Sequence, residues 1–306
     1  MSRKVIVILG PTACGKTAFA VALARRLGGA VVSADSRQVY RGLDIGSGKD
    51  LMEYTTGGEP VMTRLLDIMD PAAAEPYTLA DFMRDAKSAI LELESIGKVP
   101  ILCGGTGLYL HALIKGYELP GGPADRVFRR SVKEADPEAL AAHLSGSRPL
   151  ENGEAENPYR LSRRIEIARA SGVCSAYGGP LPGTEYLVLG ALRPRPEIHR
   201  RIEKRLDERL RCGMLEEVKG LHERGVPWEK LESFGLEYRE TARFLQGKCG
   251  FQEMRDRLLV KIRQFAKRQD TWFRKMEREG VAIRWIPPEN LDDAEFLCRR
   301  FLKREC

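Results

Sequence analysis

The sequence predicts an α/β fold, in which a parallel β-sheet is covered by helices on both faces. Short apolar runs alternate with segments of helical periodicity along the first third of the chain, which is the pattern of strand–helix–strand units. Hydrophobic residues make up 43% and charged residues 30% of the 306 residues, a mixture that buries a core without disulfides or metals. The length fits one large α/β domain with an insertion, or two domains.

The individual elements follow from local patterns. Apolar runs predict strands at 5–9, 30–33, 99–103, 187–192 and 281–286. Helical periodicity appears at 15–27, 78–96, 108–115 and 256–279, and the chain is mainly helical from residue 195. Glycine and proline become frequent between 120 and 185, around two or three short helical patterns. We therefore expect a core of residues 1–118 and 186–306 and a small helical insertion of residues 119–185.

Cysteine usage and charge narrow the class of protein. The seven cysteines are odd in number and widely spaced, and they form no CxxC pair, which argues against a disulfide framework and a zinc site. We therefore expect a reducing compartment, the cytoplasm. No apolar run approaches membrane-spanning length and there is no room for a signal peptide before the first strand, so we expect no membrane partner. The net charge of +7 fits a polyanionic partner without selecting one.

A glycine loop follows the first predicted strand. The stretch GPTACGKT matches the pattern GxxxxGK[ST] and consists of Gly10, Pro11, Thr12, Ala13, Cys14, Gly15, Lys16 and Thr17. Its glycines let backbone N–H groups converge on phosphate oxygens at the start of a helix. Lys16 adds a flexible positive charge, and the Thr17 hydroxyl is placed to reach Mg²⁺ or a phosphate oxygen. The motif predicts phosphate binding, and by itself it is typical of nucleotide hydrolases and kinases.

An acidic residue follows the second predicted strand. Asp35 comes directly after this strand, and the carboxyl ends of parallel strands line the ligand crevice of such sheets. Its carboxylate could accept a proton or orient a nucleophile, or it could cap the turn that follows. A strand ending in an acidic magnesium ligand is not evident. The nearest candidate is the weak segment 64–67, which reads RLLD.

Further motifs resemble one family along essentially the whole chain. They are SADSRQVYRGLDIGSGK (33–49), GGTGLYLHALIKG (104–116), NPYRLSRR (157–164), RIEKR (201–205), GLEYRE (235–240) and IRQFAKRQDTWF (262–273). Together with GPTACGKT, in this order and spacing, they resemble the tRNA dimethylallyltransferases. These are the bacterial enzymes that prenylate adenosine 37 of certain tRNAs.

The resemblance implies a fold, a reaction and partners. It implies a P-loop NTPase-like parallel sheet core, a helical insertion that grips the tRNA anticodon arm, and a helix-rich C-terminal part. The implied reaction moves a dimethylallyl group from dimethylallyl diphosphate to N6 of adenosine 37, in tRNAs that read codons starting with U, and releases diphosphate. Mg²⁺ is the implied cofactor, with Thr17 as a ligand, and the family suggests a monomer.

The resemblance also assigns roles to residues. The implied catalytic residues are Asp35, Thr12, Lys16 and Arg205. Arg205 and the glycine loop would neutralise the leaving diphosphate, whereas Asp35 would take a proton from the adenine amine. Thr12 and Thr106 could equally serve only to hold their own turns. The implied tRNA-binding residues are Asp35, Ser36, Arg37, Gln38, Thr106, Tyr159, Arg160, Leu161, Ser162, Arg163, Lys267 and Arg268.

Two features of the sequence lead to narrower expectations. At 100° per residue, the predicted helix 256–279 places Leu258, Ile262, Phe265 and Trp272 on one stripe, which predicts a core contact. Arg263, Lys267, Arg274 and Arg278 lie on the far side, where a basic face is either solvated or bound to phosphates. Cys14 stands at the amino-terminal end of a helix, a position that can lower a thiol pKa. We expect bound diphosphate to protect it from alkylation.

Three alternative functions share parts of this pattern. Prenylation of free AMP uses the same loop and aspartate, but it leaves the basic helix face without a purpose. A small-molecule or nucleotide kinase uses the same loop with ATP. A tRNA-binding protein without catalysis is disfavoured by the presence of Lys16, Thr17 and Asp35.

Overall fold

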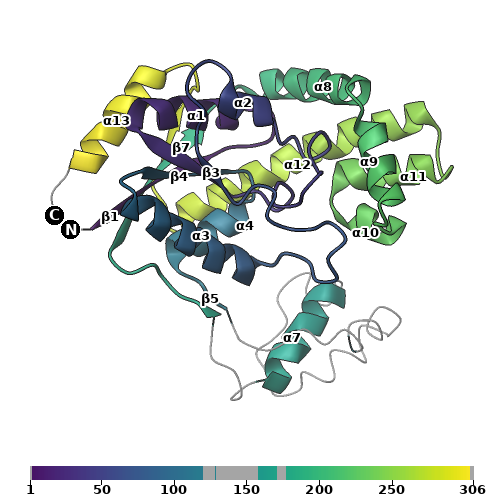
Figure 1. The fold of residues 1–306 in the computed structure, drawn as a ribbon, viewed down its shortest axis with the longest axis horizontal. Helices are drawn as coiled ribbons and strands as arrows, with labels where there is room; N and C mark the ends of the chain where they lie inside the picture. The colour runs from purple at the N-terminus through teal and green to yellow at the C-terminus, as the bar shows by residue number, and fades with distance from the viewer. Residues whose placement is uncertain (1, 120–127, 129–157, 171–176, 304–306) are drawn as a thin grey trace. The chain divides into compact units, whose positions relative to one another are not determined.

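The computed structural model describes residues 2–119, 128, 158–170 and 177–303 of the chain (Figure 1). It divides into two compact units, one formed by Met1–Lys115 with Pro180–Cys306 and the other by Gly116–Gly179. We call them the core unit and the insertion unit.

A six-stranded parallel sheet forms the centre of the core unit. Its strands are β1 (Arg3–Leu9), β2 (Gly29–Ser33), β3 (Thr63–Arg64), β4 (Val99–Gly104), β7 (Thr184–Ala191) and β8 (Ile283–Ile286). Their order is β3-β2-β4-β1-β7-β8, and every neighbouring pair is parallel. Residues 5–9 of β1 are completely buried, as expected for a central strand of a sheet covered on both faces.

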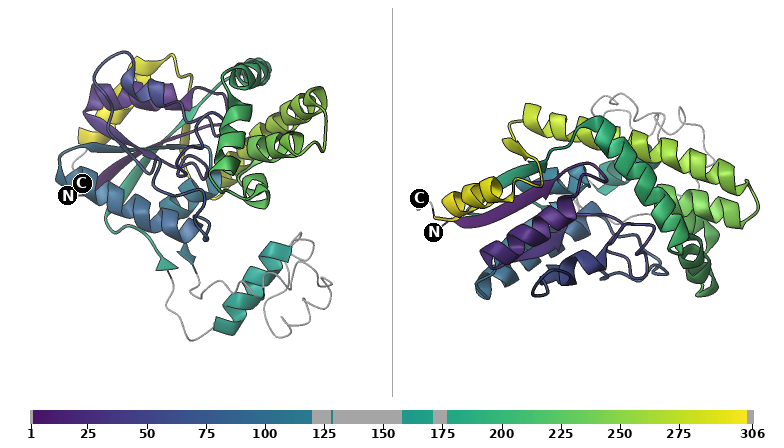
Figure 2. Two further views of the ribbon diagram at one scale, coloured as in Figure 1. Left: turned by 45° about the vertical axis from the view of Figure 1, so that its right-hand side comes forward. Right: turned by 90° about the horizontal axis from the view of Figure 1, so that it is seen from above.

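Helices cover the two faces of this sheet. Alternate residues of the strands, including Ile6 and Ile8 of β1, pack in one apolar cluster with α1 (Lys16–Leu27) and α13 (Leu291–Lys303). The helices α3 (Leu79–Ser95) and α4 (Gly107–Lys115) contact the sheet from the other side (Figures 1 and 2). A capping box at Thr78 and Asp81 starts α3, which explains its clear sequence signal. The predicted parallel sheet with helices on both faces is confirmed.

The C-terminal half of the core unit is rich in helices, as predicted. It contains α8 (Arg195–Arg211), α9 (Met214–Glu223), α10 (Trp228–Ser233), α11 (Leu236–Leu245) and the 28-residue α12 (Phe251–Arg278). Helices α8 and α12 share an apolar cluster in which Ile202 and Leu206 meet Leu258 and Ile262. This contact brings α8 and α12 together beside the sheet (Figure 2).

Several short elements were not predicted. They are α2 (Leu51–Thr55), β3, and the antiparallel pair β5 (Glu118–Leu119) and β6 (Tyr177–Gly178) of the insertion unit. The insertion unit also contains α7 (Pro158–Ala170). Strand β7 begins at Thr184, three residues before the predicted start, because Thr184 pairs with Arg3 at the sheet's end. Among the described helices, none is both long enough and apolar enough to cross a membrane.

Candidate active site

The glycine loop lies between the end of β1 and the start of α1. Ala13 and Gly15 have left-handed backbones, with φ of 65° and 89°, which turns the chain sharply into the helix. A Cβ on Gly10 would lie 2.6 Å from the Cys14 Sγ and 3.2 Å from Ala191, so this position has room only for glycine. The strand, loop and helix are arranged as the motif predicts, with the positive end of α1 at the loop.

Arg205 joins the glycine loop from α8. Its guanidinium donates a hydrogen bond to the Thr12 hydroxyl, although 193 residues separate the two in sequence. Burial and the neighbouring Arg209 lower the pKa of Arg205 to about 9, so it is still charged at neutral pH. Arg205 forms no salt bridge within the described parts of the chain. An unpaired guanidinium of this kind favours binding of an anion beside the loop.

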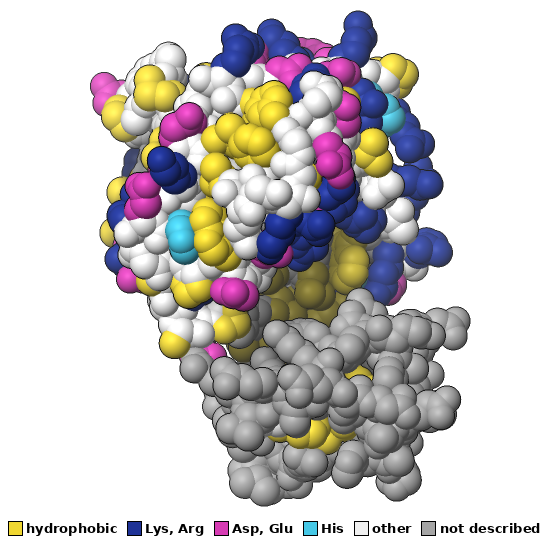
Figure 3. Space-filling view, turned by 90° about the vertical axis from the view of Figure 1, so that its right-hand side faces the viewer, with side chains coloured by type: hydrophobic (Ala, Val, Ile, Leu, Met, Phe, Trp, Pro, Cys, Tyr) yellow, Lys and Arg dark blue, Asp and Glu magenta, His cyan; other side chains and the backbone are white. Residues whose placement is uncertain are grey.

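Lys16, Thr12 and Arg205 face a cavity of about 500 Å³ in the core unit. The cavity is open to solvent and is lined by the glycine loop, the segments 35–38, 46–48 and 105–108, and helices α8, α11 and α12. Its cationic lining residues are Lys16, Arg37, Arg205, Arg209, Arg239 and Arg268, and its carboxylates are Asp35 and Glu237. Lys and Arg side chains also gather on the outer surface over the C-terminal helices (Figure 3). The cavity therefore favours an anionic ligand.

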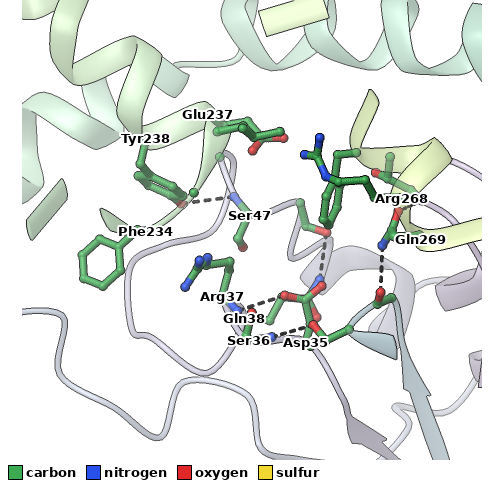
Figure 4. Close-up of a pocket in the computed structure, with 18 of the residues that line it drawn as sticks. Asp35, Ser36, Arg37, Gln38, Ser47, Phe234, Glu237, Tyr238, Arg268 and Gln269 are labelled. Atoms are coloured by element: carbon green, nitrogen blue, oxygen red, sulfur yellow. Dashed lines mark hydrogen bonds between the residues drawn. The ribbon is translucent and has the colours of Figure 1, made fainter. Parts of the chain in front are cut away.

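The segment that follows β2 forms one side of the cavity, with Asp35 at its start. Asp35 Oδ1 accepts a hydrogen bond from the Arg37 N–H at 2.9 Å, which makes an Asx turn. In the described structure, Oδ2 accepts none, so the carboxylate both caps the turn and presents an oxygen to the cavity. The Ser36 N–H donates to the Thr106 hydroxyl at 3.2 Å, which ties this segment to the turn before α4 (Figure 4). The structure thus brings Asp35, Ser36, Arg37, Gln38 and Thr106 together.

Gln269 is a site residue that the sequence reasoning missed. Its Oε1 accepts from the Thr12 N–H at 2.8 Å, and its Nε2 donates to the Gly105 carbonyl at 2.9 Å (Figure 4). One buried side chain on α12 therefore joins the glycine loop to the Gly104–Gly105 turn. A buried glutamine within a highly charged helix gives little local signal, because its partners lie far away in sequence.

Arg209, Glu237 and Tyr238 also line the cavity and were not predicted as site residues. Arg209 follows Arg205 by four residues, and this spacing places both on one face of a helix. That signal was present in the sequence. Figure 4 shows Phe234, Glu237 and Tyr238 on one side of the cavity and Arg268 and Gln269 on the other.

The prediction of a continuous core stripe on α12 is partly wrong. Leu258 and Ile262 are buried in the core as expected. Phe265 and Trp272 instead line the cavity, and Trp272 occupies the space where a Cβ of Gly107 would lie. Periodicity predicts which residues share a face, and it does not distinguish a core from a cavity wall.

The predicted basic face of α12 serves more than one purpose. Arg263 forms a salt bridge with Glu203 at 2.9 Å, so part of the charge is neutralised within the protein. Lys267 and Arg274 line a second hollow of about 360 Å³, next to Pro11 and Arg195. Arg268, one residue further along the helix from Lys267, faces the first cavity. The two adjacent cations therefore belong to different surfaces.

The segment 159–163 lies in the first half of α7 of the insertion unit. The side chains of Tyr159 and Arg160 lie outside the described residues. Leu161 and Ser162 are buried, and their role in tRNA binding stays a prediction. Arg163 is partly exposed and pairs with Glu166 at 3.2 Å.

The expectation of a reactive Cys14 is wrong. Its thiol is completely buried, and burial raises its pKa, which outweighs the lowering by Lys16 and the helix start. Bound diphosphate has little effect on a thiol that alkylating reagents cannot reach.

Asp67, the candidate acidic magnesium ligand of segment 64–67, already forms an ion pair within the protein, because it pairs with the buried Lys49.

The donor groups fit Mg²⁺ when phosphate oxygens complete its ligands. Thr17 and Asp35 line the same cavity. Across the described ranges, no group of three or more His, Cys, Asp or Glu side chains could hold a metal ion. Mg²⁺ commonly takes one or two protein oxygens together with substrate phosphates and waters. The residues present are compatible with that mode.

The fold and site define a P-loop α/β protein with a cationic cavity for a phosphorylated substrate. The model of the family described as IPP transferase matches residues 38–276, and that of isopentenyl transferase matches residues 3–62. The chain belongs to the IPP transferase family.

Individual relatives cover nearly the whole chain. It is 45% identical to tRNA dimethylallyltransferase 2 of Pelobacter propionicus, over 92% of this chain and 88% of that protein. It is 44% identical to tRNA dimethylallyltransferase 1 of Syntrophus aciditrophicus, over 95% and 96%. The crystal structure of the tRNA isopentenylpyrophosphate transferase of Bacillus halodurans superposes with a TM-score of 0.71, at 32% identity over 98% and 97% of the two chains.

Proposed function

We propose that this chain transfers the dimethylallyl group of dimethylallyl diphosphate to N6 of adenosine 37, in tRNAs that read codons starting with U. The observation that carries the proposal is the meeting of the glycine loop, Arg205 and Asp35 around one cavity. One end of this arrangement suits a leaving diphosphate, and the other suits a nucleophile that must lose a proton. Membership of the family supports the choice of donor and acceptor.

The leaving group is stabilised by fixed positive charge. Breaking the allylic C–O bond leaves cationic character on carbon and places negative charge on the diphosphate. Thr12, Lys16 and Thr17 face that charge from one side, and Arg205 faces it from α8. The Thr12 hydroxyl accepts a hydrogen bond from Arg205 and the Thr12 N–H donates to Gln269, so Arg205 and the loop are held in position before substrate arrives. Bound Mg²⁺, held by Thr17, would neutralise further diphosphate charge.

Asp35 activates the acceptor. The lone pair of the adenine amine is delocalised into the ring, which makes the amine a poor nucleophile. The open oxygen of Asp35 can accept a hydrogen bond from this N–H and take the proton as the C–N bond forms. Such acid–base help contributes roughly 10²–10⁴-fold. Phe265 and Trp272 supply apolar surface in the same cavity for the prenyl chain and for a base flipped out of its stack.

The remaining partners belong to the same proposal. The insertion unit, with Tyr159, Arg160 and Arg163, would contact the anticodon arm, together with Lys267 and Arg268 of the core unit. We propose a cytoplasmic location, because seven widely spaced cysteines without a CxxC pair suit a reducing compartment, and a monomer, as the family resemblance implies.

A direct assay separates this function from its alternatives. The protein is incubated with Mg²⁺, dimethylallyl diphosphate and unmodified tRNA, and the tRNA nucleosides are analysed by mass spectrometry. We expect N6-dimethylallyladenosine at position 37. Absence of this product at saturating donor would contradict the proposal. Equal or faster prenylation of free AMP would favour the smaller acceptor, and transfer of the γ-phosphate of ATP would reveal a kinase.

A further inference from the structure

A second arginine faces the cavity one helical turn beyond Arg205. Four residues span about one turn of an α-helix, so Arg209 lies on the same face of α8. Its Nη1 is 3.6 Å from Glu237 Oε1 of α11, and the two side chains are only 12% and 21% exposed. Both residues line the cavity with Arg205. An arginine and a glutamate from different helices are therefore paired inside the candidate active site.

The cavity wall leaves space for the Arg209 guanidinium. Gly48 has φ of 67°, and a Cβ at this position would collide with the guanidinium. The preceding residues of this wall are held in place from α9 and α11. The Glu217 carboxylate accepts from the Ile45 N–H at 2.6 Å, and the Tyr238 hydroxyl accepts from the Ser47 N–H at 3.1 Å. The surrounding backbone is thus fixed in a shape that accommodates the Arg209 guanidinium.

Most of the hydrogen-bonding capacity of Arg209 is unused. A guanidinium carries five N–H donors. Its one hydrogen bond within the described residues goes to the Gly46 carbonyl at 3.5 Å, and Glu237 at 3.6 Å lies just beyond hydrogen-bond distance. The pair is therefore loose. An anion that fits the guanidinium better can replace Glu237 as the ion-pair partner of Arg209.

Glu237 balances the charge of this part of the cavity. Arg209 lowers the pKa of Arg205, whereas Glu237 raises it, so the carboxylate attracts the Arg205 guanidinium as well as that of Arg209. The other lining carboxylate, Asp35, is held in its own turn. Without a bound anion, Glu237 is the counter-ion that reduces repulsion between Arg205 and Arg209.

We propose that Arg209 is a second guanidinium for the diphosphate and that Glu237 is its resident counter-ion. The inference rests on the proposed function, in which this cavity holds a diphosphate. When the donor binds, the diphosphate replaces Glu237 as the partner of Arg209. Glu237 stays beside Arg209 as a competing partner, which weakens binding of the free diphosphate and promotes its release.

Calorimetric titration with inorganic pyrophosphate and Mg²⁺ tests this exchange on the full chain without tRNA. We expect Arg209→Met to weaken binding by about tenfold or more, and Arg209→Lys to weaken it less. We expect Glu237→Gln to tighten binding by about three- to tenfold, because pyrophosphate no longer competes with a carboxylate. Arg211→Met, an exposed change on the same helix, is the matched control and should bind like wild type.

The double variant Arg209→Met/Glu237→Gln separates exchange of partners from simple repulsion. If Glu237 acts through Arg209, the tightening by Glu237→Gln shrinks in the Arg209→Met background. Equal tightening in both backgrounds would overturn the proposed exchange. In turnover with tRNA, Glu237→Gln should lower both kcat and the inhibition constant of pyrophosphate, because product release slows.

One further variant distinguishes failure of this inference from failure of the proposed function. Arg205→Met should abolish most pyrophosphate binding. If wild type does not bind pyrophosphate, or Arg205→Met binds it unchanged, the diphosphate site itself is wrong. If Arg205→Met weakens binding and Arg209→Met behaves like Arg211→Met, only the role of Arg209 is wrong. Thermal unfolding without ligand shows that each variant is folded.

Discussion

At the scale of single residues, the two carboxylate oxygens of Asp35 have different roles. One accepts the Arg37 N–H and fixes the turn, and the other faces the cavity. An asparagine can keep the first of these roles, because its amide oxygen still accepts a hydrogen bond. It cannot take a proton. This division makes Asp35→Asn a test of chemistry with little change in local structure.

We expect Asp35→Asn to lower kcat by about 10²–10⁴-fold and to leave pyrophosphate affinity close to wild type. Single-turnover prenylation of tRNA and pyrophosphate titration measure the two quantities. Asp70→Asn is the matched control, because Asp70 also accepts a backbone N–H two residues on, from Ala72 at 2.7 Å, but in an exposed turn. A fall in kcat of less than about tenfold would show that Asp35 is not the proton acceptor.

Glu53 is a second unusual acid near the glycine loop. Burial, and then the charge of Asp50, raise its pKa to about 7, although Lys16 and Arg205 act in the opposite direction. Its Oε2 is buried with no hydrogen-bond partner among the described residues. At pH 6 the folded protein therefore keeps this carboxyl largely protonated and spares the diphosphate site a negative charge.

This shift predicts a pH dependence of stability. The folded protein binds the Glu53 proton more tightly than the unfolded chain does, so the contribution is complete below about pH 4.5 and is lost as the pH rises through 7. Glu53→Gln should therefore be stabilising relative to wild type at pH 8 and close to neutral at pH 5. Urea unfolding at both values measures this, with the exposed Glu59→Gln as control. If the free energies of unfolding of wild type and Glu53→Gln changed in parallel with pH, the raised pKa of Glu53 would be contradicted.

At the scale of elements, α12 is a single 28-residue helix whose side chains contribute to three different surfaces. Leu258 and Ile262 bury it against α8. Phe265, Arg268, Gln269 and Trp272 form a wall of the cavity, and Lys267 and Arg274 line the second hollow. The sequence predicted the faces of this helix correctly by angle. It could not tell which apolar face meets a core, because a cavity wall and a core require the same side chains.

The salt dependence of tRNA binding tests the outer face of α12. Replacing Lys267 and Arg274 with Ala should reduce the slope of log affinity against log salt by about one to two, because each lost phosphate contact removes roughly one released counter-ion. Pyrophosphate affinity should not change. Arg300→Ala/Lys303→Ala on α13 removes the same charge from an exposed surface of another helix. An unchanged slope in the α12 variant would mean that this face is only solvated.

At the scale of the whole molecule, topology explains which parts of the site were predictable. Parallel strands bring their carboxyl ends to one edge, so the loop after β1 and Asp35 after β2 had to lie near each other. Gln269 and Glu237 reach the cavity only through the packing of α11 and α12, which no local pattern encodes, whereas Arg209 could have been found from its four-residue spacing to Arg205. Arg205 was predicted only through the family motif. The error at Cys14 has the same origin, since a helix start does not reveal burial.

The strand order also has a consequence for the order of folding. Strand β1 pairs along its whole length with β7, which the ribosome makes about 180 residues later. Until then one edge of the most buried strand is open, and the glycine loop lacks Arg205 and Gln269, which follow later still. A nascent chain that stops before residue 184 therefore exposes an apolar strand edge of the kind that aggregates or recruits chaperones. The substrate cavity is completed only near the end of synthesis.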